Sequence, residues 1–196
     1  MTTSRHDRAE DIFESWWRDL HPRPPNERPR IPGARAELAR LRRLGIQSTP
    51  EGPRVDVAGA MTIESFRHLL RRFESRKDRP RDDLLVVAAC CIARVKGHRG
   101  DASTAELLGG SEHAEERKLS ESRFLRFLRV RSPEELMDQG RRLADFLNEG
   151  APVGEFAWSL CRWLDAPTVR QRWAQDYYGL GQTTAGPTPS TSVQPQ

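Results

Sequence analysis

The stretch DLLVVAACCIARV, residues 83–95, decides the fold because it is apolar on nearly every side. Val86 and Val87 would also suit a β-strand. The length of the run, its alanines and its helical neighbours favour an α-helix instead. A helix that is apolar all round must be enclosed by other elements. We therefore predict a central buried helix whose packing partners come from both sides of it in the sequence.

The segments before the central helix contain amphipathic patterns. An apolar stripe at helical spacing is formed by Ile12, Phe13, Trp16, Trp17 and Leu20. Further helices are expected over residues 34–44 and 62–73, the second with Thr62 as its N-cap. The intervening residues 21–33 and 47–59 are rich in proline or glycine. We expect both to be loops.

The segments after the central helix carry stronger helix signals. Ser132, followed by a proline and two glutamates, indicates an N-cap and the first turn of a helix. The apolar positions of this helix, which we expect in the core, are Leu136, Leu143, Phe146 and Leu147. Other helices are expected over residues 119–130, 156–164 and 166–177, and a short helical piece over 104–108.

These patterns predict an all-α protein of about eight helices with no convincing strand. We expect two small helical lobes with a boundary near the glycines at 109–110. Residues 1–110 would form an N-terminal helical lobe and 111–180 a C-terminal helical bundle. The tail, residues 181–196, has almost no large apolar side chain and is expected to be disordered.

The composition points to a protein of the cytoplasm. No apolar run approaches the ~20 residues needed to span a bilayer, so we expect no contact with a membrane. The N-terminal residues lack the apolar segment of a secretory signal. The three cysteines, Cys90, Cys91 and Cys161, lie in apolar segments. Their odd number and their surroundings indicate buried thiols in a reducing compartment.

No motif for catalysis, cofactor binding or metal binding is present. The five histidines are scattered, and none pairs with a cysteine, carboxylate or second histidine at a spacing suited to zinc. We find no phosphate-binding loop and no nucleophile elbow. We therefore expect no enzyme activity, no cofactor and no metal. An active site assembled from distant residues, or a small-molecule module, remains an alternative.

The positive charge is concentrated in two segments. Residues 21–43 carry a net charge of +5 and residues 117–142 a net charge of +4, whereas the whole chain carries only +4. Of the 32 basic residues, 29 are arginine, whose planar group matches phosphate. A GC-rich coding sequence would also favour arginine, so the distribution is the stronger observation. It indicates a polyanionic partner.

The spacing of these arginines fits a sugar–phosphate chain. Arg123 and Arg126 lie three residues apart and share a helix face. Arg35 and Arg42, about two turns apart, share another. We see no helix that presents Asn or Gln beside Arg at base-reading spacing. The prediction is sequence-independent, salt-dependent binding to phosphates. The alternative for any one arginine is a solvated surface group paired with a nearby acid.

The order of segments resembles the CasB family, the small subunit of the type I-E CRISPR Cascade complex. The resemblance covers roughly residues 9–180. It rests on the aromatic first helix, the central apolar helix, and the segments Gly33–Arg43, Ser122–Arg129, Gly140–Leu143 and Trp163–Tyr178. Each piece is weakly specific alone, and their joint order carries the resemblance.

The resemblance implies an all-helical, non-catalytic subunit of two lobes that pairs as a homodimer in Cascade. Its implied partners are the crRNA, both strands of the target DNA, and the backbone and large subunits. Its implied role is to stabilise the crRNA–target hybrid and the displaced strand of the R-loop. The arginines at positions that match the family's basic ones are Arg35, Arg42, Arg43, Arg123, Arg126, Arg141 and Arg142.

Charge clustering alone adds three more candidate nucleic-acid contacts, Lys96, Arg129 and Arg131. A free-standing helical regulator that binds duplex DNA is the alternative function. It would need a recognition helix and a preference for particular sequences.

Overall fold

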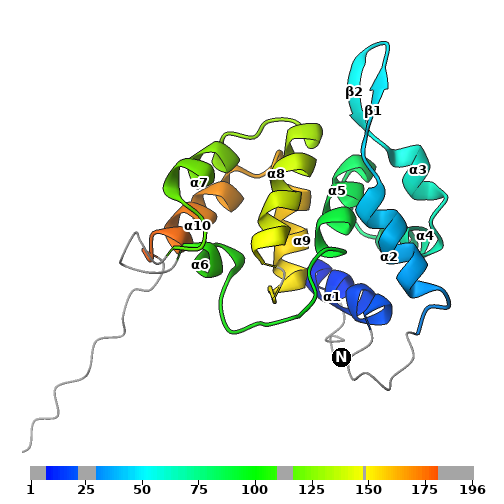
Figure 1. The fold of residues 1–196 in the computed structure, drawn as a ribbon, viewed down its shortest axis with the longest axis horizontal. Coiled ribbons are helices and arrows are strands. Elements are labelled where there is room, and N and C mark those ends of the chain that lie inside the picture. The colour runs from blue at the N-terminus through cyan, green and yellow to red at the C-terminus, as the bar shows by residue number, and fades with distance from the viewer. Residues whose placement is uncertain (1–7, 22–29, 110–116, 148, 181–196) are drawn as a thin grey trace, which may run out of the picture.

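A computed structural model describes residues 8–21, 30–109, 117–147 and 149–180. Within these ranges the protein has ten α-helices and one two-stranded β-hairpin (Figure 1). The predicted all-α class is therefore confirmed, with ten helices in the described ranges where about eight were expected and a hairpin where no strand was expected. The predicted tail (181–196) and most of the predicted proline-rich loop (22–29) lie outside the described residues.

Helix α5 (Asp82–Ile92) is the central buried helix that the sequence predicts. All nine of its residues from Leu84 to Ile92 are buried. Asp82 and Asp83 occupy its first turn, where negative charge is favoured by the helix dipole. The helices that pack against it are α2 (Ala34–Arg43), α3 (Val57–Met61), α4 (Glu64–Phe73), α8 (Pro133–Phe146) and α9 (Val153–Arg162).

Helix α1 (Ala9–Leu20) buries the predicted aromatic stripe. It packs mainly against α9 and also against α2 and α4. The indole of Trp16 donates a hydrogen bond of 2.7 Å to the carbonyl of Ser65. The indole of Trp17 donates to the carbonyl of Ile92, at 3.1 Å, where α5 ends. Two buried indoles therefore both fill the core and satisfy backbone acceptors.

The C-terminal helices meet around a cluster of aromatic rings. Phe124 of α7 (Glu121–Leu128) stacks on Tyr177 of α10 (Pro167–Tyr177) with 3.8 Å between ring centroids. Phe127 contacts Trp163 and Trp173, with centroids 4.2 and 5.4 Å away. Short helix α6 (Thr104–Leu108) packs on α10. The two phenylalanines fix the rotation of α7, which decides where its other side chains point.

Ser132 begins α8 as predicted. Its side chain accepts a hydrogen bond from the Glu135 N–H, at 3.2 Å, and Pro133 occupies the first turn. Gly140 of α8 lies against Cys91 of α5: an added Cβ would be 2.9 Å from the Sγ of Cys91. The glycine allows the two helices to approach each other at this point.

The prediction of a loop over residues 47–59 is wrong. Strands β1 (Ile46–Thr49) and β2 (Gly52–Val55) form an antiparallel hairpin in which Ile46 pairs with Val55, and α3 follows. Gly52 has a φ of 118°, a conformation that favours glycine in a turn. Pro53 is tolerated because each strand of a two-stranded ribbon has a free edge.

The prediction of Thr62 as an N-cap is also wrong. Thr62 follows α3, and its hydroxyl donates to the carbonyl of Gly59 at 2.7 Å. The first amides of α4 are capped instead by the carboxylate of Glu37 from α2. This carboxylate accepts from the N–H groups of Glu64 and Ser65, at 3.2 and 2.7 Å. A cap supplied by a distant helix leaves no local signal.

The division into two lobes stays a prediction. In Figure 1, α2, α3 and α4 lie at one side of the molecule and α6, α7 and α10 at the other. Helices α8 and α9 lie between the two groups. Contacts of α1 and α5 with α9, and of α5 with α8, cross the predicted boundary at residues 109–110.

Candidate nucleic-acid interface

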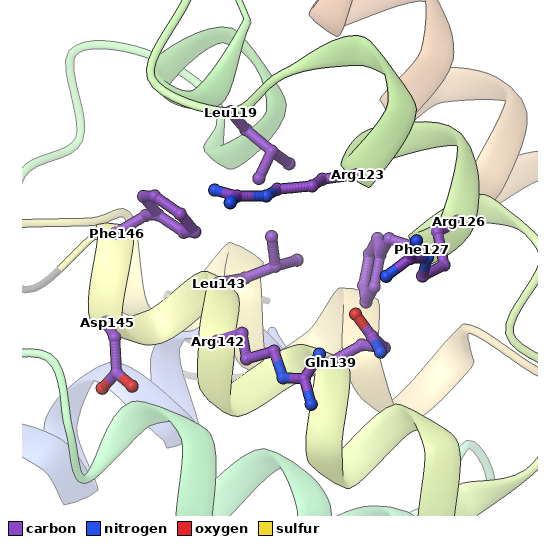
Figure 2. A pocket seen from close by; sticks show the side chains of 9 residues that line it. All are labelled: Leu119, Arg123, Arg126, Phe127, Gln139, Arg142, Leu143, Asp145 and Phe146. Carbon is purple, nitrogen blue, oxygen red and sulfur yellow. The ribbon is translucent and has the colours of Figure 1, made fainter.

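A cleft of about 420 Å³ lies between α7 and α8 (Figure 2). Three predicted site residues line it, Arg123 and Arg126 from α7 and Arg142 from α8. We call them the cleft arginines. All three are at least partly exposed. The structure therefore brings together side chains from two segments that are separated by a turn.

The local sequence explains why these arginines face the cleft. Phe124 and Phe127 of α7 are buried in the aromatic cluster. Arg123 and Arg126 each precede one of them, so they lie about 100° around the helix from the buried face. On α8, the buried stripe includes Leu143 and Ala144, and Arg142 lies on the opposite, exposed face.

Phe146 is the unexpected member of the cleft. Its spacing in the sequence predicts a core position, but 37% of it is exposed. Leu143 and Leu147, four residues apart, already complete the buried stripe of α8. Phe146 lies at the flank of that stripe. The guanidinium of Arg123 reaches over its ring, 5.7 Å from the centroid, and Figure 2 shows the two facing each other.

The cleft carries net positive charge. Asp145 is the acidic residue in its lining, and it pairs with Arg94 outside the cleft at 3.3 Å. Among the residues that the structure describes, no ion pair neutralises a cleft arginine. The cleft therefore holds three exposed guanidinium groups and one carboxylate, which is paired with an arginine outside the cleft. This is an electrostatic arrangement suited to phosphate.

Two predicted site residues, Arg42 and Arg141, donate hydrogen bonds to backbone carbonyls of the fold, although Arg42 is also exposed. The Nε of Arg42 donates to the carbonyl of Ala93 at 2.7 Å, which ties α2 to the end of α5. Arg141 donates to the carbonyl of Leu44, which ties α8 to the residue after α2. We call Arg42 and Arg141 the clamp arginines.

His21 lies near the clamp and stacks on Trp17, with 4.3 Å between ring centroids. Burial, aided by the positive charge of Arg42, lowers the pKa of His21 to about 4. This histidine is therefore neutral at pH 7 in the folded protein.

The remaining predicted residues lie outside the cleft lining. Arg131 donates to the carbonyls of Leu128 and Val130, at 2.9 Å each, and so closes the end of α7. The others are exposed and comprise Arg35 and Arg43 on α2, Lys96 after α5, and Arg129 at the C-cap of α7.

Gln139 also lines the cleft, one turn before Arg142, although it is not among the predicted site residues. A signal for it exists in the sequence, because residues three apart on a helix share a face. A second cleft, of about 610 Å³, holds Arg30, Arg71 and Arg72. Its lining also includes Asp19, which lies 3.8 Å from Arg30, so its charge is more nearly balanced.

The buried cysteines are unreactive, as their apolar surroundings predict. Cys90, Cys91 and Cys161 are buried free thiols. Burial raises the pKa of Cys90 to about 12, and it also raises the pKa values of Cys91 and Cys161 well above the ordinary value of a thiol. A thiol that stays protonated at neutral pH is a poor nucleophile and a poor metal ligand.

The described part of the chain offers neither a metal site nor a membrane span. No group of three or more histidine, cysteine, aspartate or glutamate residues there could hold a metal ion. No helix in those ranges has the length and apolar character to cross a membrane.

A known family matches most of the chain. Residues 37–178, more than half of the chain, match the family model described as CRISPR-associated protein Cse2. The matched region contains both the cleft arginines and the clamp arginines. No curated protein and no solved structure matches the chain.

Proposed function

Because the chain belongs to the CRISPR-associated Cse2 family, also called CasB, we propose that it holds nucleic acid by its phosphates within a Cascade complex. In this proposal it is a non-catalytic subunit of antiviral defence. It stabilises the crRNA–target DNA hybrid and the displaced strand of the R-loop. The single observation that carries the proposal is the convergence of three solvent-facing arginines in the α7–α8 cleft.

The physical reason for such a subunit lies in the energetics of the R-loop. Replacing a DNA duplex by an RNA–DNA hybrid is nearly balanced in free energy, so protein contacts to the backbone can decide the outcome. The guide supplies the sequence information by base pairing. A subunit that adds only phosphate contacts therefore strengthens every target equally, and its contribution weakens as salt rises.

The clamp arginines have a different role in this proposal. Arg42 and Arg141 hold α2, α5 and α8 together through backbone carbonyls. They therefore support the interface without needing to touch nucleic acid, and Arg131 does the same at the end of α7. Direct contact is proposed for the cleft arginines first. The exposed residues Arg35, Arg43, Lys96 and Arg129 are proposed as further contacts outside the cleft, those of α2 at the other side of the molecule from α7.

The proposed partners follow from the family and from the charge. They are the crRNA, the target and displaced strands of the DNA, the backbone and large subunits of Cascade, and a second copy of this chain as a homodimer.

The test is the double substitution Arg123→Ala with Arg142→Ala in an assembled complex. Both side chains reach solvent, so the fold should be retained while R-loop formation on target DNA weakens. The slope of log binding constant against log salt should fall by roughly 0.7–0.9 for each phosphate that the protein no longer neutralises. Target-binding titrations at several salt concentrations measure both effects.

A matched control removes the same charge elsewhere. Arg54 and Arg71 are exposed arginines outside the α7–α8 cleft. The double variant Arg54→Ala with Arg71→Ala should bind target DNA as the unchanged protein does. If both double variants lose the same affinity for target DNA, the effect comes from the net charge of the protein and not from the cleft. If the cleft variant loses no affinity, the proposal is contradicted.

A further inference from the structure

We propose that the α7–α8 cleft receives one unpaired nucleotide, whose base stacks on Phe146 while the cleft arginines hold the flanking phosphates. The proposal rests on the function proposed above and makes it more specific. It assigns the cleft to the displaced single strand of the R-loop and not to the hybrid.

The first observation is the position of the Phe146 ring. The large apolar side chains that are exposed in the described ranges are Leu125, Phe146 and Leu180. Of these, Phe146 alone is aromatic, and it lines the cleft whereas the other two do not. Stacking on an aromatic side chain is how proteins hold unpaired bases without reading their sequence.

The second observation is the set of groups around the ring. The guanidinium of Arg123 lies 5.7 Å from the ring centroid, and arginine planes themselves stack on bases. Figure 2 shows Phe146 toward one end of the cleft and Arg126 with Gln139 toward the other. A nucleotide in the cleft would therefore meet a stacking surface and a phosphate-binding cation on different sides.

The size of the cleft fits this occupant. Its volume of about 420 Å³ lies within the range of about 300–1,000 Å³ that is usual for small-ligand sites. A paired base in a duplex is already stacked on both faces and could not reach the Phe146 ring. A duplex would contact the arginines alone and would leave the exposed ring of Phe146 without a contact. The combination therefore favours an unpaired strand.

The experiment uses the assembled complex and a target duplex that is already open. In this duplex the displaced strand is a run of thymidines that cannot pair with the target strand. A second duplex replaces the thymidines with abasic sites. Both strands carry the same phosphates and neither is paired, so only the bases differ. The rate at which the complex dissociates from each duplex is measured.

The unchanged protein should leave the abasic duplex faster than the thymidine duplex, by a factor on the order of ten. The complex with Phe146→Leu should dissociate from both duplexes at the same rate, the faster one. The reason is that leucine keeps apolar bulk but offers no ring. Phe146→Trp should restore the difference. Leu125→Ala is the matched control, since Leu125 is also 37% exposed but lies outside the cleft lining, and it should behave as the unchanged protein.

Two outcomes would overturn the inference. One is a Phe146→Leu complex that still distinguishes the two duplexes; if it also dissociates faster from both by the same factor, the ring has a packing role. The other is failure of Phe146→Leu to enter the complex although the isolated chain is folded, which would assign the ring to contact with a protein subunit.

The same assay separates this inference from the proposed function. Arg126→Ala should shorten the lifetime on both duplexes by an equal factor, because both keep their phosphates. If it does so while Phe146→Leu has no effect, the stacking inference fails and the phosphate-binding function stands. If Arg126→Ala also has no effect, both fail.

Discussion

Arg141 and Arg142 are neighbours in the sequence of α8, yet they belong to two different regions of the molecule. Arg141 points toward α2 and donates to the carbonyl of Leu44. Arg142 reaches solvent and lines the cleft beside α7. One step along a helix rotates a side chain by about 100°, which is enough to separate a structural role from a binding role.

The comparison shows that clustered charge does not assign a role to each residue. Arg141 and the cleft arginines come from the same basic segment, residues 117–142, Arg42 comes from the other, and all of them have the same chemistry. They differ in whether a backbone carbonyl lies within reach. An arginine with such an acceptor stabilises the fold, whereas one without it remains available to a phosphate. Substitutions in the two groups of arginines should make this difference in role measurable, or show that it does not exist.

The largest effect is expected from Arg141→Met. The methionine keeps part of the apolar stem but leaves the Leu44 carbonyl without its charged donor, so the free energy of unfolding should fall by roughly 2–3 kcal/mol. Arg142→Met should change it by less than about 0.5 kcal/mol. Chemical denaturation of the two variants measures the difference. Equal losses would remove the distinction between the two regions.

The second largest effect is expected from acid, which should lower the free energy of unfolding through His21, beside the clamp arginines. His21 has a folded pKa of about 4, below its ordinary value, so the unfolded chain takes up a proton first as the pH falls. The stability from a neutral His21 is complete above about pH 6.5 and is lost as the pH falls toward about 4. By pH 5 the loss should be about 2 kcal/mol.

The control for acid sensitivity is His21→Phe, which keeps a ring against Trp17 but cannot titrate. Denaturation at pH 7 and pH 5 should show a much smaller loss in this variant than in the unchanged protein. A loss of the same size in both would mean that other groups cause the acid sensitivity.

The smallest effect should appear in the salt dependence of binding. Arg126→Ala removes one expected phosphate contact, so the slope of log binding constant against log salt should fall by roughly 0.7–0.9. Arg42→Met should leave this slope unchanged, because its guanidinium is bound to the carbonyl of Ala93. Titrations of target DNA at several salt concentrations provide the measurement. A reduced slope for Arg42→Met would place a clamp arginine on the nucleic acid.

The central helix and the start of α8 were predictable because their signals are local. The all-apolar run from Leu84 to Ile92 and the cap at Ser132 both lie within the elements that they specify. The cap of α4 was not predictable, because Glu37 supplies it from another helix. The hairpin was missed because its two prolines and its glycine suggest a loop when read without the pairing partner.

The candidate site was predictable in part for the same reason. The i, i+3 spacing of Arg123 and Arg126 correctly placed them on one face. Whether Arg42 and Arg141 would find backbone acceptors depends on helices that are distant in sequence, so spacing alone could not show it. Phe146 was misplaced because it lies at the edge of an apolar stripe, where only the tertiary arrangement decides burial.

The packing of α1 on α9 has a consequence for the newly made chain. The main packing partner of α1 is α9 (Val153–Arg162), which follows it by more than 130 residues. Helix α1 therefore cannot complete this contact until that segment has left the ribosome. Until then Trp16 and Trp17 have no finished core to enter, and exposed apolar surface of this kind attracts chaperones and promotes aggregation. Nascent chains halted before residue 153 should therefore bind a hydrophobic dye that the completed chain excludes.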